Sequence, residues 1–337
     1  MLSYTRVSVG LVFFIWGIVS PHTDARGVKT LRVGYGNSLQ EEHTCTALPL
    51  DKDNEEYIVT FDPKADPSRV LHLSVQVCDD IPSHELLWSC GDGVPGCIGD
   101  IRPVYVWGLN STIWRLPPDT AIPVGGASGG RFIVLQAHIH KPRHSDRMMS
   151  SHPHYAEVKL HVTTRRPRFE VGLMILGNTG FIPPQQPRFV SESACPWNSV
   201  QSAFVLGYRL HTHRLGRWIE GYAVSEEGWK LIGEGRPLSP ENVHRSFTKQ
   251  ILRNGDFLAS RCYYENLQSK PVNFGSDFHD EMCNFHLLYV FPYGSAPSLR
   301  FRTCAQDAQV FHLKDAFFSV VEEKMHTGGK SDTQYGY

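Results

Sequence analysis

The chain has 337 residues, of which 41% are hydrophobic and 20% are charged, and its formal net charge at pH 7 is -1. These values indicate a folded chain long enough for two domains, and they exclude intrinsic disorder. The balanced charge gives no indication of nucleic acid or an anionic membrane as a partner.

The N-terminal segment has the features of a secretory signal. Arg6 precedes an almost wholly apolar run over 7–19, and small or polar residues follow over 20–25. Because this run is short for a membrane span, we predict a signal peptide over 1–25, with cleavage after Ser20 or Ala25. An uncleaved anchor is the alternative. No later run is long and apolar enough to cross a bilayer, so we expect no membrane anchor and a location in the secretory vesicle lumen or outside the cell.

Eight cysteines in an exported chain predict disulfide bonds. Four lie in each half of the chain, which suggests two separately cross-linked domains: Cys45, Cys78, Cys90 and Cys97, then Cys195, Cys262, Cys283 and Cys304. Structural zinc is the less favoured alternative, because paired CxxC knuckles are absent. The sequon at Asn110 predicts glycosylation of a surface loop.

The first half reads as a series of strands from about residue 56 onward. Residues 28–45 show no clear pattern, whereas 57–61 is β-branched and aromatic and 62–67 forms a turn cluster. Apolar and polar residues alternate over 70–78, 131–140 and 157–163, which is typical of half-buried strands. The second of these places Gln136, His138 and His140 on one face. The polar stretch 141–154 is expected to be a loop.

The best candidate for a domain boundary is the basic segment 164–168. Strand-like stretches follow over 171–176, 218–224, 229–232, 257–262 and 284–290, and 313–324 suggests a short terminal helix. Short strands with Gly/Pro turns predict an all-β fold of two tandem antiparallel β-sandwiches of jelly-roll type, each cross-linked internally by disulfides. We place the domains at 26–165 and 169–325, followed by a tail over 326–337.

The stretch 208–216 reads YRLHTHRLG and carries the clearest chemical signal. In an extended strand Arg209, His211 and His213 share one face, so both imidazoles can bind one metal ion beside a cation. A second stretch, 276–284, contributes the thioether of Met282. Imidazoles with a thioether suit copper(I). A strand with two surface histidines and a core methionine is the alternative.

A second histidine cluster is expected in the first half. His72 lies in the polar row of the strand 70–78, and His138 faces the same way on its own strand, with His140 as a possible third ligand. A purely structural role for His72 remains open. Nucleophile-elbow, P-loop, dinucleotide and HExxH motifs are absent from the sequence. We interpret Glu281, beside Met282, as a structural or supporting residue.

Together, the HTH motif at 211–213, the block DEMCN at 280–284, the LQAH run at 135–138 and the cysteine pattern resemble the copper type II, ascorbate-dependent monooxygenases. The resemblance covers about residues 45–316 and is strongest to the branch that hydroxylates peptidylglycine. It implies two copper ions per chain, ascorbate as the reductant and O2 as the co-substrate. His211, His213 and Met282 match the catalytic copper ligands, and His72 and His138 match ligands of the electron-transfer copper.

Further roles come from the same resemblance. Arg209 and Asn284 match contacts to the substrate, Arg209 to its carboxylate, and Gln136 matches a residue between the two copper sites. The implied disulfide pairs are Cys45–Cys90, Cys78–Cys97, Cys195–Cys304 and Cys262–Cys283.

Two positions depart from the pattern of that family. Leu71 stands where the family has a first-site histidine, and His286 stands where it has a substrate-contacting tyrosine. One hypothesis is that His140 replaces the ligand missing at Leu71. The slightly favoured alternative is a two-coordinate or weak copper site, with Leu71 joining the core row of Leu73 and its neighbours.

The resemblance therefore implies hydroxylation of the Cα atom of a C-terminal glycine, the first step of peptide amidation. We expect glycine-extended peptides as substrates and a monomer. Because the chain ends shortly after the matching region, we also expect a separate peptidyl-hydroxyglycine lyase acting in trans. Two alternatives stay open: a dopamine β-monooxygenase-like hydroxylase, for whose extra N-terminal domain there is no room here, and a secreted copper-binding protein whose catalysis has lapsed.

Overall fold

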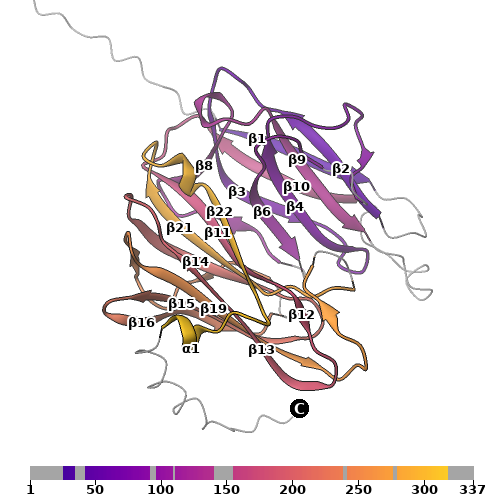
Figure 1. The fold of residues 1–337 in the computed structure, drawn as a ribbon. Coiled ribbons are helices and arrows are strands. Elements are labelled where there is room, and N and C mark those ends of the chain that lie inside the picture. The colour runs from indigo at the N-terminus through magenta and orange to yellow at the C-terminus, as the bar shows by residue number, and fades with distance from the viewer. Residues whose placement is uncertain are drawn as a thin grey trace, which may run out of the picture.

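The computed structural model describes residues 26–34, 42–91, 96–108, 111–139, 155–237, 241–275 and 279–317. The predicted signal peptide, Asn110, His140, the expected loop 141–154 and the tail lie outside these residues. Within them the chain is all-β, with only short helical turns (Figure 1).

The first half is a sandwich of two sheets. One has the strand order β5-β2-β9-β4-β6, and the other contains β1-β10-β3-β8. Side chains that alternate inward fill the space between them, as at Leu73 and Val75, both 0% exposed. The strands are β1 (Arg26–Gly34), β2 (Glu42–Pro49), β3 (Glu56–Lys64), β4 (Val70–Cys78), β5 (Trp88–Ser89), β6 (Arg102–Gly108), β7 (Trp114–Arg115), β8 (Thr120–Val124), β9 (Phe132–Ile139) and β10 (Tyr155–Thr163), with the 3-10 turn η1 (Gly126–Ser128).

The second half repeats this architecture around its own core. A sheet of order β13-β19-β15-β16 packs on strands β11-β21-β14-β17, and Trp197, Phe285 and Tyr289 lie between them. The elements are β11 (Phe169–Thr179), β12 (Phe181–Ile182), β13 (Gln186–Pro196), β14 (Ala203–His211), β15 (Gly216–Ser225), β16 (Gly228–Gly235), β17 (His244–Arg245), β18 (Ile251–Leu252), β19 (Phe257–Asn266), β20 (Val272–Asn273), β21 (Asn284–Pro292), η3 (Pro297–Leu299), β22 (Phe301–Asp307) and α1 (Leu313–Ala316).

The two halves share one sheet. β8 pairs in parallel with β11, at Thr120–Phe169 and Ala121–Glu170, so a single 11-stranded sheet runs through both sandwiches (Figure 1). A buried ion pair sits beside this join: the Arg300 Nε atom lies 2.6 Å from a Glu170 carboxylate oxygen, and Arg300 also donates to the Ser128 carbonyl oxygen. The other strand pairs are antiparallel except β11–β22. The relative placement of the halves is therefore set by backbone hydrogen bonds and a buried charge pair.

Three local expectations are corrected by the structure. Residues 28–45, which showed no clear pattern, contain most of β1 and the first half of β2, because β1 pairs with β10 and β2 with β9 over their whole lengths. Tertiary pairing thus outweighs weak local propensity. The expected turn at 62–67 begins later, since Asp62–Lys64 continue β3. The terminal helix covers Leu313–Ala316 only, and residues beyond 317 are outside the described part.

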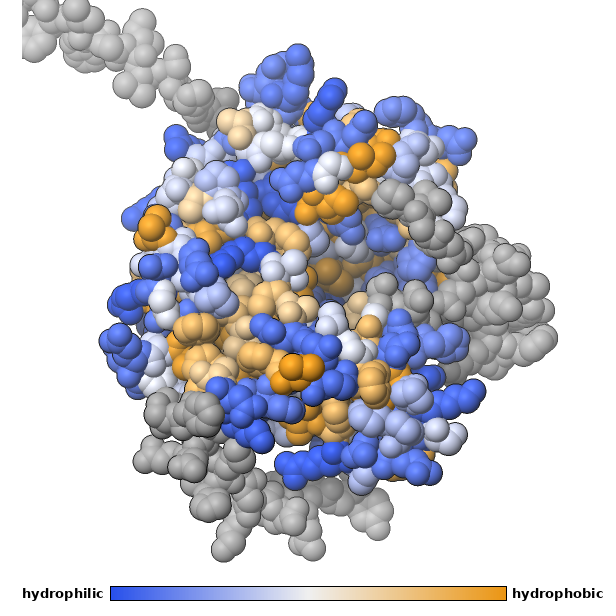
Figure 2. All heavy atoms as spheres, viewed as in Figure 1, coloured by the Kyte–Doolittle hydropathy of each residue, from blue (hydrophilic) through white to orange (hydrophobic). Residues whose placement is uncertain are grey.

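Four disulfides cross-link the sandwiches, and they are the four pairs implied by the resemblance: Cys45–Cys90, Cys78–Cys97, Cys195–Cys304 and Cys262–Cys283. Each closes within one half, and bonds of this kind are typical of oxidising compartments. In the described part of the chain, no helix has the length and apolarity needed to cross a membrane. Hydrophilic residues surround a more hydrophobic middle on the face shown in Figure 2.

Candidate metal sites

The residues of the HTH motif lie where two central strands of the second half meet. In the antiparallel pair β14–β21, Arg209 lies opposite His286 and His211 lies opposite Asn284. Residues directly opposite each other share a sheet face, so these four side chains form one polar cluster. β14 ends at His211, and His213 follows in the next turn.

Each of the two imidazoles, His211 and His213, is oriented by a hydrogen bond at its Nδ1 atom. His211 Nδ1 lies 2.8 Å from a Glu241 carboxylate oxygen, and His213 Nδ1 lies 2.8 Å from the Asp280 carbonyl oxygen. The ring centroids are 5.3 Å apart. When Nδ1–H donates to an oxygen, Nε2 keeps its lone pair, which is the usual arrangement of metal-binding histidines. The two rings therefore fit one metal ion.

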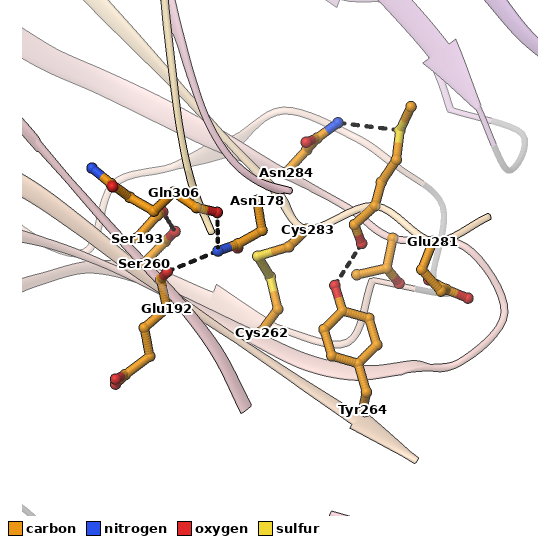
Figure 3. The surroundings of a disulfide bond; sticks show 12 residues. Asn178, Glu192, Ser193, Ser260, Cys262, Tyr264, Glu281, Cys283, Asn284 and Gln306 are labelled. Carbon is orange, nitrogen blue, oxygen red and sulfur yellow. Dashed lines mark hydrogen bonds between the residues drawn. A yellow bond between two sulfur atoms is a disulfide. The ribbon is translucent and has the colours of Figure 1, made fainter. Parts of the chain in front are cut away.

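The segment that carries Met282 is held on several sides. The Asn284 amide lies 3.3 Å from the Met282 sulfur, and the Tyr264 hydroxyl donates to the Met282 carbonyl oxygen over 2.6 Å (Figure 3). The Cys262–Cys283 disulfide anchors the next residue to β19. Since Asn284 lies opposite His211, the thioether comes to the same end of the cluster as the imidazoles. Two imidazoles with a thioether are a donor set suited to copper(I).

Glu281 holds the backbone of the turn that carries His213. Its side chain is fully buried and accepts hydrogen bonds from the backbone N–H groups of His213 (3.0 Å) and Leu215 (2.7 Å). Burial raises the pKa of the Glu281 carboxyl to about 7, although these N–H donors act in the opposite direction. Glu281 thus fastens the turn that presents His213, in agreement with a structural or supporting role.

We predict that replacing Glu281 with alanine lowers the free energy of unfolding. Two buried N–H groups would lose their acceptor, and each unsatisfied group costs about 1–3 kcal/mol. Glu281→Gln is the matched control, because the amide oxygen can still accept one of these bonds. Chemical denaturation of the copper-free proteins measures the difference. Equal stabilities for the alanine variant and the unaltered protein would show that the turn does not depend on Glu281.

Arg209 is buried and already paired with an acid. It is 3% exposed, forms a salt bridge to Glu241, donates from Nε to the Glu241 carbonyl oxygen (3.2 Å) and contacts His286 Nδ1 through Nη1 (3.0 Å). Burial lowers the pKa of Arg209 to about 10, so the guanidinium is charged at neutral pH. Sequence reasoning missed Glu241, which lies in a loop without periodicity and carries no motif that points to Arg209.

A second histidine set lies in the first half and includes a residue that the sequence did not reveal. His43 on β2, His138 on β9 and His72 on β4 are register neighbours across three adjacent strands. One ring nitrogen from each lies within 4.8 Å of the others. The prediction of His72 and His138 as neighbours is thus matched by the geometry, while His43 was missed because its strand was not recognised. His140 lies outside the described residues.

The position of the missing family histidine is visible in the strand register. Val70 pairs with Ile139 and His72 with His138, so Leu71 is the extra residue of a β-bulge. Leu71 is half-buried, whereas Leu73 and Val75 are fully buried. Leu71 therefore does not join the core row of those residues, as the alternative interpretation supposed.

The two histidine sets influence each other across the two halves. Burial, the neighbouring His138 and His43, and then His213 and Arg209 of the second half lower the pKa of His72 to about 3. A loop of the second half also reaches the first: the Asn242 amide oxygen accepts a 2.7 Å hydrogen bond from the backbone N–H of Thr112. His213 and Arg209 thus lie close enough to His72 for their charges to affect its pKa.

Copper uptake by His211 and His213 should depend little on mildly acidic pH. Burial, first of all, lowers the pKa of both rings, so at mildly acidic pH each ring stays neutral to a greater extent than an unperturbed histidine. We expect the copper(I) affinity of this site to fall by less between pH 7 and pH 5.5 than the loss of about 100-fold that two unperturbed histidines would show. Competition titration measures it, and Glu281→Gln controls for titration of that carboxyl. A 100-fold loss would contradict the prediction.

Comparison with known proteins agrees with this geometry. The model of the copper type II ascorbate-dependent monooxygenase N-terminal domain matches residues 35–146, and that of the C-terminal domain matches residues 169–317. The mouse peptidyl-glycine alpha-amidating monooxygenase is 29% identical over 84% of this chain, and the Xenopus laevis form A is 26% identical over 87%. Human dopamine beta-hydroxylase is 24% identical over 83%.

The alignments cover only part of these relatives. They span 28% of the mouse protein, 31% of the Xenopus protein and 48% of the human one. Among solved structures, the bacteriophage PM2 major capsid protein P2 aligns with 80% of this chain and 99% of its own, at 8% identity and a TM-score of 0.28, which is too low to indicate a shared fold. Two matched domains and a histidine set in each half lead to one conclusion: the chain belongs to the copper type II ascorbate-dependent monooxygenase family.

Proposed function

We propose that the protein is a peptidylglycine α-monooxygenase of the secretory vesicle lumen or the extracellular space. It would use O2, ascorbate and two copper ions per chain to hydroxylate the Cα atom of a peptide's C-terminal glycine. Relatives named for peptide amidation support this substrate. The observation that carries the proposal is the cluster in which a buried cation, Arg209, and the Asn284 amide lie beside His211 on one sheet face.

Each residue of the cluster has a distinct task in this scheme. When bound, copper supplies the one-electron chemistry that activation of O2 requires. His211 and His213 would hold it through Nε2, with Met282 as the third ligand. Arg209 would orient the terminal carboxylate, and this positions the glycine Cα–H near the metal. His72 and His138 would hold the second copper, with Gln136 between the sites. The α-hydroxyglycine product would then be a substrate for a peptidyl-hydroxyglycine lyase.

One observation favours a second candidate, hydroxylation of an amine. The charge of Arg209 is already balanced by Glu241, and both side chains are almost completely buried. A peptide carboxylate would have to displace Glu241 from Arg209 or remain in the site without a positive charge to pair with. Burying an unpaired carboxylate costs free energy. A substrate without a carboxylate meets no such cost. The relative human dopamine beta-hydroxylase makes a phenylethylamine the natural comparison.

Oxygen consumption by the copper-loaded protein with ascorbate tests both candidates. Three substrates are compared: a peptide ending in glycine, the same peptide already amidated, and a phenylethylamine. Turnover of the first alone, with an α-hydroxyglycine product by mass spectrometry, is expected. Turnover of the amine alone would reject the peptidylglycine proposal and support the second candidate, hydroxylation of an amine. Turnover of none would favour a copper-binding protein whose catalysis has lapsed.

A further inference from the structure

We propose that His43 is the third ligand of the first copper site and takes the place of the histidine that is missing at Leu71. The inference rests on the proposed function for the identity of the metal, but it concerns which residues of this chain bind it. The proposed ligand lies on β2, whereas the family's histidine would lie at position 71 on β4. It also replaces the earlier hypothesis that assigned this role to His140.

The backbone places His43 where a third ligand is needed. Within the sheet β2-β9-β4, His43 lies opposite His138, and His138 lies opposite His72. Directly opposite residues point to the same face, so three imidazoles project from three neighbouring strands as a row. The ring of His43 is 4.0 Å from that of His138 and 6.2 Å from that of His72, centroid to centroid. His138 is therefore the middle member of the set.

The β-bulge at Leu71 explains why a replacement from another strand is possible. A bulge sets two consecutive residues of one strand against a single residue of its partner, so positions 71 and 72 both lie opposite the His138 region. A histidine at 71 could reach the same metal as His72. With leucine there, β4 supplies only the nitrogen of His72, and His43 supplies a further nitrogen from the opposite side of His138.

The donor set suits a closed, histidine-only copper(I) site. The three ring nitrogens lie within 4.8 Å of one another, and about 3.5 Å is expected for three nitrogens around a metal at bond lengths of about 2 Å. Small side-chain rotations close this difference. Space is also reserved for the ring: a Cβ atom added at Gly91 would lie 2.8 Å from His43 Nδ1. A larger residue at 91 would push the imidazole out of its place.

The alternative is that His43 only stacks on His138, because the two rings are inclined by 25°. Stacking and metal binding make different predictions for a phenylalanine. His43→Phe keeps an aromatic ring over His138 and removes the nitrogen, whereas Leu71→His adds a nitrogen at the family position. His43→Phe, alone and combined with Leu71→His, separates the two roles.

The test is copper(I) binding to the full-length secreted protein without substrate, for the unaltered chain, His43→Phe, His43→Ala and His43→Phe/Leu71→His. X-ray absorption reports the number of nitrogen ligands, and competition titration reports affinity. We expect both His43 variants to weaken the first site at least about 100-fold and to lose one nitrogen ligand, and the double variant to regain both. His84→Ala, outside the set, is the control for general effects.

Two results would overturn the inference. One is a first site of unchanged affinity and ligand number in His43→Phe. The other is a double variant that does not recover, since a true replacement must be interchangeable with a histidine at 71. Copper retained at the Met282 site shows that each variant is folded. Because no readout uses turnover, inactivity toward all substrates would reject the proposed function and leave this inference standing.

Discussion

Replacing His213 with alanine is expected to remove one of two copper ions and reduce ascorbate-dependent turnover at least about 100-fold, because even loss of an outer-sphere partner costs 10–100-fold. His213 Nδ1 contacts only the Asp280 carbonyl oxygen among the described hydrogen bonds, so the substitution removes a ligand with little other disturbance. Copper per chain by elemental analysis and oxygen uptake measure the two effects.

The matched control for this prediction is His244→Ala. His244 is an exposed histidine on β17 of the same half, and its ring stacks on Tyr208 rather than facing the cluster. It should keep both copper ions and its turnover. If His213→Ala retained full copper and full activity, the HTH motif would not be the catalytic metal site, and the proposed mechanism would fail with it.

Replacing Glu241 with glutamine is expected to change substrate binding strongly, because Glu241 is the charge partner of Arg209. The change leaves the buried guanidinium of Arg209 without its counter-ion, at a cost of about 3–5 kcal/mol in stability. A carboxylate-bearing substrate can then pair with Arg209. We expect the KM for a glycine-extended peptide to fall at least about tenfold, and the peptide to raise the melting temperature of the variant.

For an amine substrate we expect the KM to rise in Glu241→Gln, because the positively charged amine loses a nearby negative charge and meets the uncompensated positive charge of Arg209. The direction of the KM change therefore separates the two candidate substrates within one variant. Glu265→Gln is the control: it removes the partner of Arg217 in an exposed salt bridge, which contributes little. A peptide KM that is unchanged in Glu241→Gln would mean that Arg209 does not bind the carboxylate.

The sequence predicted those parts of the site that lie on strongly alternating strands or in compact motifs. His72 and His138 could be placed on common faces because β4 and β9 alternate clearly, and Met282 was recognised through its motif. His43 could not, because β2 becomes a strand through pairing with β9 rather than through its own composition. Glu241 could not either, since its contact with Arg209 joins a loop to a strand, and no periodicity encodes such a contact.

The bulge at Leu71 shows the limit of reading strands by period two. Strict alternation assigns residues 71 and 73 to the same face, and this led to the interpretation of Leu71 as a core residue. The extra residue in β4 shifts the alternation by one, so Leu71 leaves the core row while His72 stays opposite His138. Only the register across the sheet reveals this.

The parallel contact between β8 and β11 has a consequence for electron transfer. Backbone hydrogen bonds of one sheet connect the two sandwiches, so this sheet helps to set the spacing between them. Under the proposed function, an electron would pass between the two histidine sets of one chain across a gap of that spacing, without a second molecule. Turnover per molecule should accordingly be independent of protein concentration.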